Sequence, residues 1–270
     1  MRITEIACRD ALARSGIPGV DYALNPYRGC AHSCVYCYAT YLGRWHHPDE
    51  QWGTFVDVRV NIADRLARQL KHINSGCIQI GTATDPYQPL ERRYELTRAC
   101  LQRLIFFGGE VDLLTKSDLV LRDADILKSL ANCQVGLTVT TAQDEVAGIF
   151  EPKAPPPSRR IAALGELRRH GLKTYAFVGP LLPELTDTDA ALAALFVALS
   201  EVKPDFVYVD TLNLSYSLWG QMCAFARHRY PALLPALTYV KRNRPVYEND
   251  LRRRVEEAAL RYGLNCRVLF

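Results

Sequence analysis

The sequence has no stretch of the roughly 18 uninterrupted apolar residues that a membrane-spanning helix needs. Its longest apolar run, from Ala190 to Leu199, is too short and indicates a buried helix face. The first residues, MRITEIACRDALARSG, lack the apolar stretch of a secretory signal. Linker-like segments, low-complexity tracts and internal repeats are also missing. We therefore expect a cytoplasmic protein without a membrane partner. One domain would span residues 1–270, with its core at about 20–215 and an extension at about 216–270.

A strong excess of either charge is lacking as well. The net charge is +4 over 270 residues, which permits an anionic partner without requiring one. Hydrophobic residues make up 49% of the chain and charged residues 23%. This composition is typical of an ordinary globular protein with a substantial core.

From about residue 54, short apolar segments that suit strands alternate with segments of helical spacing. The expected strands are 77–82, 111–115, 134–140, 174–178 and 206–211, and the expected helices are 60–73, 97–107, 121–130, 158–170 and 187–200. Such repeated units predict an α/β fold with parallel strands covered by helices. A short strand before Cys30 would bring the count to about six units. We therefore expect a partial (β/α)6 TIM-type barrel with outer helices and a helical C-terminal extension. A doubly wound open sheet is the alternative.

Polar loops follow several of these strands. In either architecture, ligands bind at the carboxyl ends of parallel strands. We expect these loops to lie together at the carboxyl ends of the strands, a region called the mouth below; they are residues 81–85, 115–117, 138–141 and 179–180.

Nine cysteines are present, an odd number that argues against a disulfide framework in a chain without an export signal. In a reducing compartment, closely spaced cysteines more often bind metal. Only Cys30, Cys34 and Cys37 are closely spaced. The other six are expected to be inert core thiols: Cys8, Cys77, Cys100, Cys133, Cys223 and Cys266.

The three clustered cysteines lie four and three residues apart within NPYRGCAHSCVYCYAT, residues 25–40. Three thiolates can hold three irons of a [4Fe–4S] cluster and leave the fourth iron open to a non-protein ligand. Such an open position marks a chemical site rather than a structural one. The alternatives are a Cys3His zinc site that includes His32, and three coincidental core thiols. Zinc fits the spacing less well, because zinc motifs usually place their second ligand pair a dozen or more residues away.

The cysteine spacing, with Tyr36 just before the last cysteine, resembles the signature of the radical S-adenosylmethionine (radical SAM) superfamily. Five motifs in this order resemble its spore photoproduct lyase-like branch, also called DNA repair photolyase-like. They are NPYRGCAHSCVYCYA, GTATDPYQPLE, LLTKS, FEPKAPPPSRRI and FVGPLLP, and they fall within residues 20–215.

This resemblance implies a [4Fe–4S] cluster and S-adenosylmethionine as cofactors. In the superfamily, the cofactor chelates the open iron and is cleaved reductively to methionine and a 5′-deoxyadenosyl radical, which abstracts hydrogen from a substrate. An electron donor of the flavodoxin or ferredoxin type is implied as a partner. The resemblance makes the chain a radical SAM enzyme whose substrate is unassigned.

Individual residues can be matched to the branch as well. Tyr36 resembles the aromatic residue whose backbone contacts the adenine, and Lys116 resembles a basic residue near the cofactor's carboxylate. Tyr38, which matches a tyrosine of the radical relay, and Asp85 are the candidate catalytic residues. The other candidate cofactor-binding residues are Thr82, Thr138, Thr140 and Arg160. A structural role is the alternative for each of them, such as packing, helix capping or a solvated loop charge.

The chain departs from the repair enzyme at Thr82. That position aligns with the cysteine that returns a hydrogen atom to the thymine radical, and a threonine hydroxyl lacks thiol chemistry. Cys77 is close in sequence but lies early in its expected strand, away from the mouth. Counterparts of the repair enzyme's extra N-terminal region and C-terminal hairpin are not recognisable. The comparison therefore argues against spore photoproduct repair.

Two other functions stay open. One is radical chemistry on a nucleic acid, because the C-terminal region interleaves tyrosines with basic groups at 227–229, 241–244 and 252–254. Acidic residues lie close to these groups, so a solvated helix face is the favoured interpretation; they are Glu248, Asp250, Glu256 and Glu257. The other is an iron–sulfur or zinc-binding protein without turnover, against which the polar strand-end loops argue.

Overall fold

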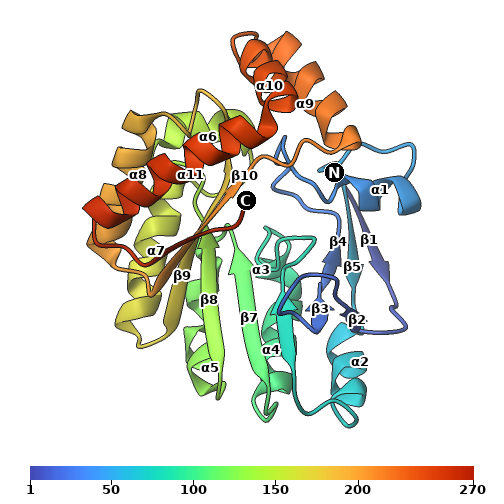
Figure 1. The fold of residues 1–270 in the computed structure, drawn as a ribbon. Coiled ribbons are helices and arrows are strands. Elements are labelled where there is room, and N and C mark those ends of the chain that lie inside the picture. The colour runs from blue at the N-terminus through green and yellow to red at the C-terminus, as the bar shows by residue number, and fades with distance from the viewer.

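The computed structural model describes the backbone of all 270 residues and every side chain except those of Arg44, Tyr216 and Ser217. Its main feature is a sheet of eight strands in the order β11-β10-β9-β8-β7-β6-β3-β2 (Figure 1). Neighbouring strands are parallel except β2 and β3, which are antiparallel. The strands are β2 (Leu12–Arg14), β3 (Tyr22–Leu24), β6 (Cys77–Ile80), β7 (Glu110–Thr115), β8 (Cys133–Thr138), β9 (Lys173–Leu181), β10 (Phe206–Thr211) and β11 (Cys266–Val268).

Helices connect most of the parallel strands and cover one face of the sheet. Along the chain they are α1 (Thr40–His46), α2 (Ile62–Gln69), α3 (Glu91–Tyr94), α4 (Leu96–Leu104), the 3-10 helix η1 (Asp118–Asp123), α5 (Ala124–Ser129), α6 (Asp144–Phe150), α7 (Pro157–Arg169), α8 (Asp189–Val202), α9 (Tyr216–Arg229), α10 (Leu233–Arg242) and α11 (Arg244–Arg261). Successive side chains of a strand point to opposite faces of the sheet, so only alternate residues face the helices. In β7, Val111 and Leu113 are buried in the apolar core together with Leu164 and Leu167 of α7. Asp112, between them, belongs to the opposite face.

The predicted α/β class and parallel sheet are confirmed, and β10 has the predicted bounds. The sheet is open: β2 and β11 are its two ends, and no pairing between them is present in the described backbone. The C-terminal part is not only helical as expected, because β11 pairs in parallel with β10 and brings the chain back into the sheet.

A second, smaller sheet supports the cysteine loop, and the periodicity did not predict it. Strand β5 (Phe55–Arg59) lies between β1 (Arg2–Ile6) and β4 (Tyr27–Arg28). Gly29 follows β4 with a φ of +83°, and a Cβ there would lie 2.5 Å from the Phe55 carbonyl oxygen. Only glycine fits this close approach, so β5 fixes where the cysteine loop begins.

Helices α9 and α10 cover the cysteine loop at the carboxyl ends of the strands. Leu218, Met222 and Leu233 pack in one apolar cluster with Cys34 and Tyr36. Figure 1 shows both helices in orange at the top of the molecule, on the same side as α1. The C-terminal helices therefore cover the part of the mouth that holds the cysteine loop.

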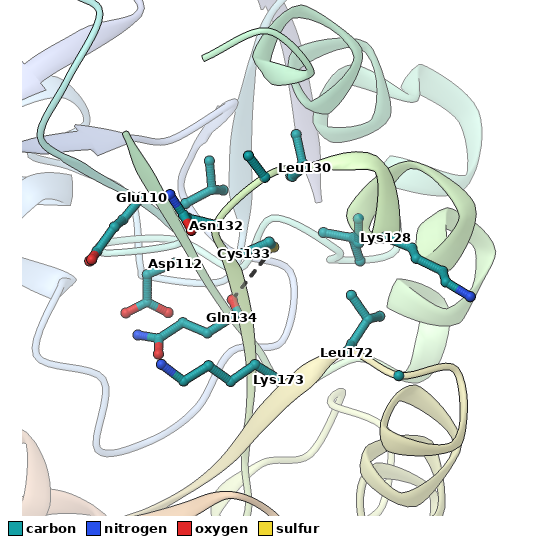
Figure 2. Close-up of a pocket in the computed structure, with 13 residues that line it drawn as sticks. Glu110, Asp112, Lys128, Leu130, Asn132, Cys133, Gln134, Leu172 and Lys173 are labelled. Atoms are coloured by element: carbon teal, nitrogen blue, oxygen red, sulfur yellow. Dashed lines mark hydrogen bonds between the residues drawn. The ribbon is translucent and has the colours of Figure 1, made fainter. Parts of the chain in front are cut away.

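A cavity of about 340 Å³ opens at the other end of the sheet, at the amino ends of β7 and β8. Of the residues that line it, Glu110, Asp112, Gln134 and Lys173 lie together on one side of the strand in Figure 2. Ligands of parallel sheets bind at the carboxyl ends of the strands, so this cavity lies at the end where function is not expected. Of the helices that the structure describes, none is both long and apolar enough to cross a membrane.

Candidate functional site

The three clustered cysteines lie on one tight loop between β4 and α1. Cys30 and Cys34 are buried and Cys37 is half-buried, and all nine cysteines of the chain are free thiols. Two successive turns shape the loop: the Ser33 N–H donates to the Cys30 carbonyl at 3.3 Å, and the Cys37 N–H donates to the Cys34 carbonyl at 3.2 Å. The spacing of the cysteines therefore places three thiols in one small volume.

The electrostatics of this loop oppose three unassisted thiolates. Burial raises the pKa of Cys34 well above its ordinary value, and negative neighbours, including Glu151 and the other two thiolates, raise it further. Burial and the Cys30 thiolate together raise the pKa of Cys37 to about 12. Lys116 opposes both shifts. Cations bound among the sulfurs would remove the penalty, since a coordinated thiol is deprotonated outright. The donor set therefore fits an iron–sulfur cluster.

Side chains from distant elements hold the backbone of the loop. The Gln88 amide accepts from the Ala31 N–H at 2.9 Å and donates to the Gly29 carbonyl at 3.2 Å. The Val35 N–H donates to the Phe150 carbonyl at 2.8 Å, and the Val35 carbonyl accepts from the side chain of Gln221 in α9. The loop is thus held before any cofactor binds.

Lys116 and Tyr36 lie together beside the cysteines, and their predicted contacts with the cofactor stay predictions. The Lys116 ammonium lies 5.6 Å from the centre of the Tyr36 ring, a cation–π distance. The Tyr36 hydroxyl donates to the carboxylate of Glu151, which also accepts from the Thr140 hydroxyl at 3.3 Å. Burial raises the pKa of Glu151, and the Arg160 guanidinium opposes that shift.

Arg160 is completely buried, and its donors are used within the protein. They reach the Pro155 carbonyl at 2.6 Å, the Thr138 carbonyl at 3.2 Å and the Glu151 carboxylate. Its location beside Thr138 and Thr140 agrees with the predicted neighbourhood. A cofactor contact of Arg160, Thr138 or Thr140 stays a prediction. The hydrogen bonds of Arg160 show that it holds Glu151 and the neighbouring backbone carbonyls in place.

The loop after β6 brings the other predicted residues to the same mouth. The Thr82 hydroxyl accepts from the Asn25 side chain at 2.8 Å, and the Thr82 carbonyl accepts from the hydroxyl of Tyr38. Tyr38 is 52% exposed, so its ring borders solvent next to Cys37. Cys77 is the first residue of β6, at the far end of that strand from Thr82, as predicted.

Asp85 follows β6 and is held by three hydrogen bonds. Its carboxylate accepts from the Thr115 hydroxyl at 2.6 Å and from the backbone N–H groups of Lys116 at 2.7 Å and Tyr87 at 2.8 Å. Burial would raise the pKa of Asp85, but the His32 imidazole and these donors outweigh it and hold the pKa at about 2. Asp85 is therefore an anion that links the loop after β6 to the loop after β7.

His32 lies on the cysteine loop with 1% of its surface exposed. Its Nδ1 is 3.4 Å from a carboxylate oxygen of Asp85, but the geometry is not that of a hydrogen bond, and neither ring nitrogen has a hydrogen-bond partner among the described residues. The described His, Cys, Asp and Glu side chains include no group of three arranged to hold a single metal ion. The geometry thus gives no support to a Cys3His zinc site.

Sequence reasoning missed three residues that organise the site: Asn25, Gln88 and Glu151. Asn25 and Gln88 lie inside the quoted motifs, so those motifs carried a signal for them. Glu151 also lies inside a quoted motif, FEPKAPPPSRRI, together with its partner Arg160, but only the fold brings Tyr36 to it across 115 residues.

Comparison with known proteins agrees with this geometry. Residues 24–197 match the family described as the radical SAM superfamily. An uncharacterized protein of Methanocaldococcus jannaschii is 36% identical over 219 residues, which is 80% of either chain. A protein of Pseudomonas phage M6 described as a radical SAM Nα-GlyT isomerase is 26% identical over 196 residues, 72% of this chain and 40% of the relative.

Among solved structures, a spore photoproduct lyase variant with bound AdoMet and dinucleoside spore photoproduct superposes with a TM-score of 0.74. The match covers 99% of this chain and 82% of that one, at 16% identity. At this identity the likeness establishes the fold, and the open parallel sheet is therefore the one found in that enzyme.

Proposed function

The chain belongs to the radical SAM superfamily of enzymes, and from that premise we propose that Cys30, Cys34 and Cys37 hold a [4Fe–4S] cluster that binds S-adenosylmethionine. The chemistry that these groups supply when bound is reductive cleavage of S-adenosylmethionine to methionine and a 5′-deoxyadenosyl radical, which abstracts hydrogen from a substrate. The observation that carries the proposal is one loop with three free thiols and a neighbouring lysine, in which the pKa values of Cys34 and Cys37 are raised.

The residues around the loop would bind and orient the cofactor. The Lys116 ammonium is a fixed positive charge beside Tyr36 and suits a carboxylate. Thr82, Thr138 and Thr140 border the same mouth and suit the polar parts of the cofactor. The apolar faces of α9 and α10 would exclude water from the site, which strengthens every electrostatic interaction inside it.

The proposed architecture is a single domain in which β3 and β6 to β10 form a partial (β/α)6 barrel. Residues 216–270 would be its extension and would close part of the mouth. Electrons would come from a donor of the flavodoxin or ferredoxin type, and Tyr38 and Asp85 stay candidate catalytic residues. Asp85 would act mainly by holding Lys116 through its backbone N–H.

The test is anaerobic purification with iron quantification, followed by reduction with dithionite in the presence of S-adenosylmethionine. We expect several irons per chain and formation of 5′-deoxyadenosine. Cys34→Ala should abolish both iron binding and cofactor cleavage. Cys133→Ala, at a half-buried cysteine in β8 outside the loop, is the matched control and should change neither. Purification with zinc and no iron, or no cofactor cleavage by the iron-loaded protein, contradicts the proposal.

A nucleic-acid substrate is the second candidate, favoured by an acid-free segment beside the site. Residues 211–247 contain five Lys or Arg and no Asp or Glu. Arg244 pairs with Glu248, and of the described residues none forms an ion pair with the other four: Arg227, Arg229, Lys241 and Arg242. The basic groups of α11 differ, because Arg253 and Arg254 both pair with Asp250. The expected interpretation, a solvated helix face whose basic groups are balanced by acidic ones, therefore holds for α11 but not for α9 and α10.

Two further observations agree with this second candidate. The ammonium of Lys241 lies 4.1 Å from the centre of the Trp219 ring, and Tyr239 is 52% exposed, so aromatic surface accompanies the charges. A structural neighbour, a spore photoproduct lyase variant, is described as binding a dinucleoside spore photoproduct. Spore photoproduct repair itself is not proposed, because Thr82 stands in place of the hydrogen-donating cysteine.

Binding of a fluorescent 20-nucleotide single-stranded DNA at increasing salt tests the second candidate. The double variant Arg227→Glu/Arg229→Glu should weaken binding and reduce the slope of log K against log salt by about 1.4, since each lost contact contributes about 0.7. The control Arg253→Glu, whose arginine is already paired, should have a much smaller effect. Absence of binding at low salt would exclude a nucleic-acid substrate of this kind.

A further inference from the structure

His32 is the one feature of the cysteine loop to which the proposed function gives no role. A buried donor or acceptor that lacks a partner costs about 1–3 kcal/mol. Neither nitrogen of the His32 imidazole makes a hydrogen bond among the described residues, and only Nδ1 has an ionic contact, with Asp85. Such a cost is seldom retained beside polar side chains that are themselves bound, as the neighbouring Gln88 and Asp85 are. The imidazole therefore indicates a partner that is present when the site is filled.

The surroundings of His32 narrow the choice of partner. Nδ1 lies 3.4 Å from Oδ2 of Asp85, an ionic contact that leaves Nε2 without a partner among the described residues. The side chain of Cys30 is close enough for its thiolate to influence the imidazole electrostatically. With 1% of its surface exposed, His32 is also closed to bulk solvent. Besides Asp85, the Cys30 side chain is the neighbour that could accept a hydrogen bond from the imidazole.

We propose that His32 is a positioning residue whose ring N–H donates a hydrogen bond to cluster sulfur at Cys30, either the thiolate or the adjoining sulfide. This inference rests on the proposed cluster. Hydrogen bonds to the sulfurs are one of the determinants of the reduction potential of an iron–sulfur cluster. Reduction adds negative charge, so a donor at the sulfur stabilises the reduced state and makes the cluster easier to reduce.

Removing the donor should therefore make reduction harder. A hydrogen bond to a charged group contributes about 1.5–3 kcal/mol, and the oxidised cluster would retain part of it. We expect the one-electron reduction equilibrium of His32→Leu to fall by about tenfold, which corresponds to a potential about 59 mV more negative. His32→Gln retains an N–H donor of similar reach and should stay within about threefold of the wild type.

The test is an EPR-monitored redox titration of anaerobically reconstituted protein without S-adenosylmethionine, with iron content measured on each sample. His47→Gln is the matched control: this histidine is also largely buried, but it pairs with Asp57 in the small sheet. It should leave the potential unchanged. A shift in His32→Leu that His32→Gln reverses supports the inference.

The remaining outcomes are equally decisive. If His32→Leu carries full iron at the wild-type potential, or at a less negative one, the inference is wrong. If His32→Leu loses the cluster, His32→Gln decides: normal iron and potential support the donor, and loss of iron shows that the imidazole only packs the loop. A wild-type protein without iron would refute the proposed function itself, whereas a potential independent of His32 refutes this inference alone.

Discussion

The two ends of the parallel sheet each hold a half-buried aspartate, and the pKa values of these two carboxyl groups are shifted in opposite directions. At the carboxyl end, hydrogen-bond donors and the His32 imidazole keep the pKa of Asp85 at about 2. At the amino end, burial raises the pKa of Asp112 to about 6, and the Tyr175 hydroxyl only partly offsets it. Asp112 borders the cavity of Figure 2.

The difference follows from what each end of a parallel sheet provides. Backbone N–H groups of the loops after β6 and β7 point at Asp85, so its charge is stabilised before any ligand binds. Asp112 lies within a strand, where the backbone groups are used in the sheet, and it must rely on side chains. Prearranged polar groups thus mark the functional end, and a cavity alone does not.

Removal of the Asp85 carboxylate should have the largest effect. Asp85→Ala leaves two backbone N–H groups and the Thr115 hydroxyl without their acceptor, and we expect a loss of about 3–5 kcal/mol in the free energy of unfolding at pH 7. Because the folded-state pKa is lowered, the stability from ionisation is present above about pH 4 and is lost as the pH falls through about 2. Urea unfolding of the cluster-free wild type and variant at several pH values measures this difference in the free energy of unfolding. An equal loss at pH 7 and at pH 2.5 would contradict this explanation.

Glu151 challenges the comparison, because it lies at the functional end and yet its pKa is raised. Its charge depends on Arg160, so Arg160→Met should cost about 3 kcal/mol by leaving a buried carboxylate unpaired. The double variant Arg160→Met/Glu151→Gln should recover much of that loss, and urea unfolding of all four proteins gives the coupling. Additive losses would show that the pair does not act as a unit.

The sequence predicted the residues at the carboxyl end of the sheet better than those at the amino end, and the reason is physical. The cysteines, Asp85 and Lys116 fall in short motifs, and each strand after Cys30 up to Thr211 was found from apolar runs, apart from β5 of the small sheet. Strand β11 was missed, because three partly exposed residues give no periodic pattern. Asp112 was missed, because its partner Tyr175 is 63 residues away. Glu151 was missed although Arg160 lies in the same motif, because the burial that raises its pKa and its contact with Tyr36 come from the fold.

Neutralising Asp112 should stabilise the protein, the opposite of the effect at Asp85. The folded-state pKa is raised, so its favourable contribution is complete below about pH 4 and is lost as the pH rises through about 6. Asp112→Asn has no charge to bury at high pH, so its free energy of unfolding should exceed that of the wild type by about 1–3 kcal/mol at pH 7.5 and differ little at pH 4. Its amide could also donate to Oε1 of Gln79, which has no hydrogen-bond partner among the described residues. Urea midpoints between pH 4 and 8 check the prediction, and a destabilised variant at pH 7.5 would refute it.

The smallest effect is expected from the donor that partly stabilises Asp112. The Tyr175 hydroxyl donates to that carboxylate at 2.8 Å, while the Tyr175 ring packs against Gly136, where a Cβ would lie only 2.2 Å from the ring. Tyr175→Phe keeps the ring in this contact and removes only the hydroxyl, so we expect a loss of about 1 kcal/mol at pH 7.5. In the Asp112→Asn background the loss should shrink, because a neutral amide needs the donor less than a carboxylate does. If the loss is the same in both backgrounds, the hydroxyl does not act through the charge of Asp112, and the contrast between the two ends rests on burial alone.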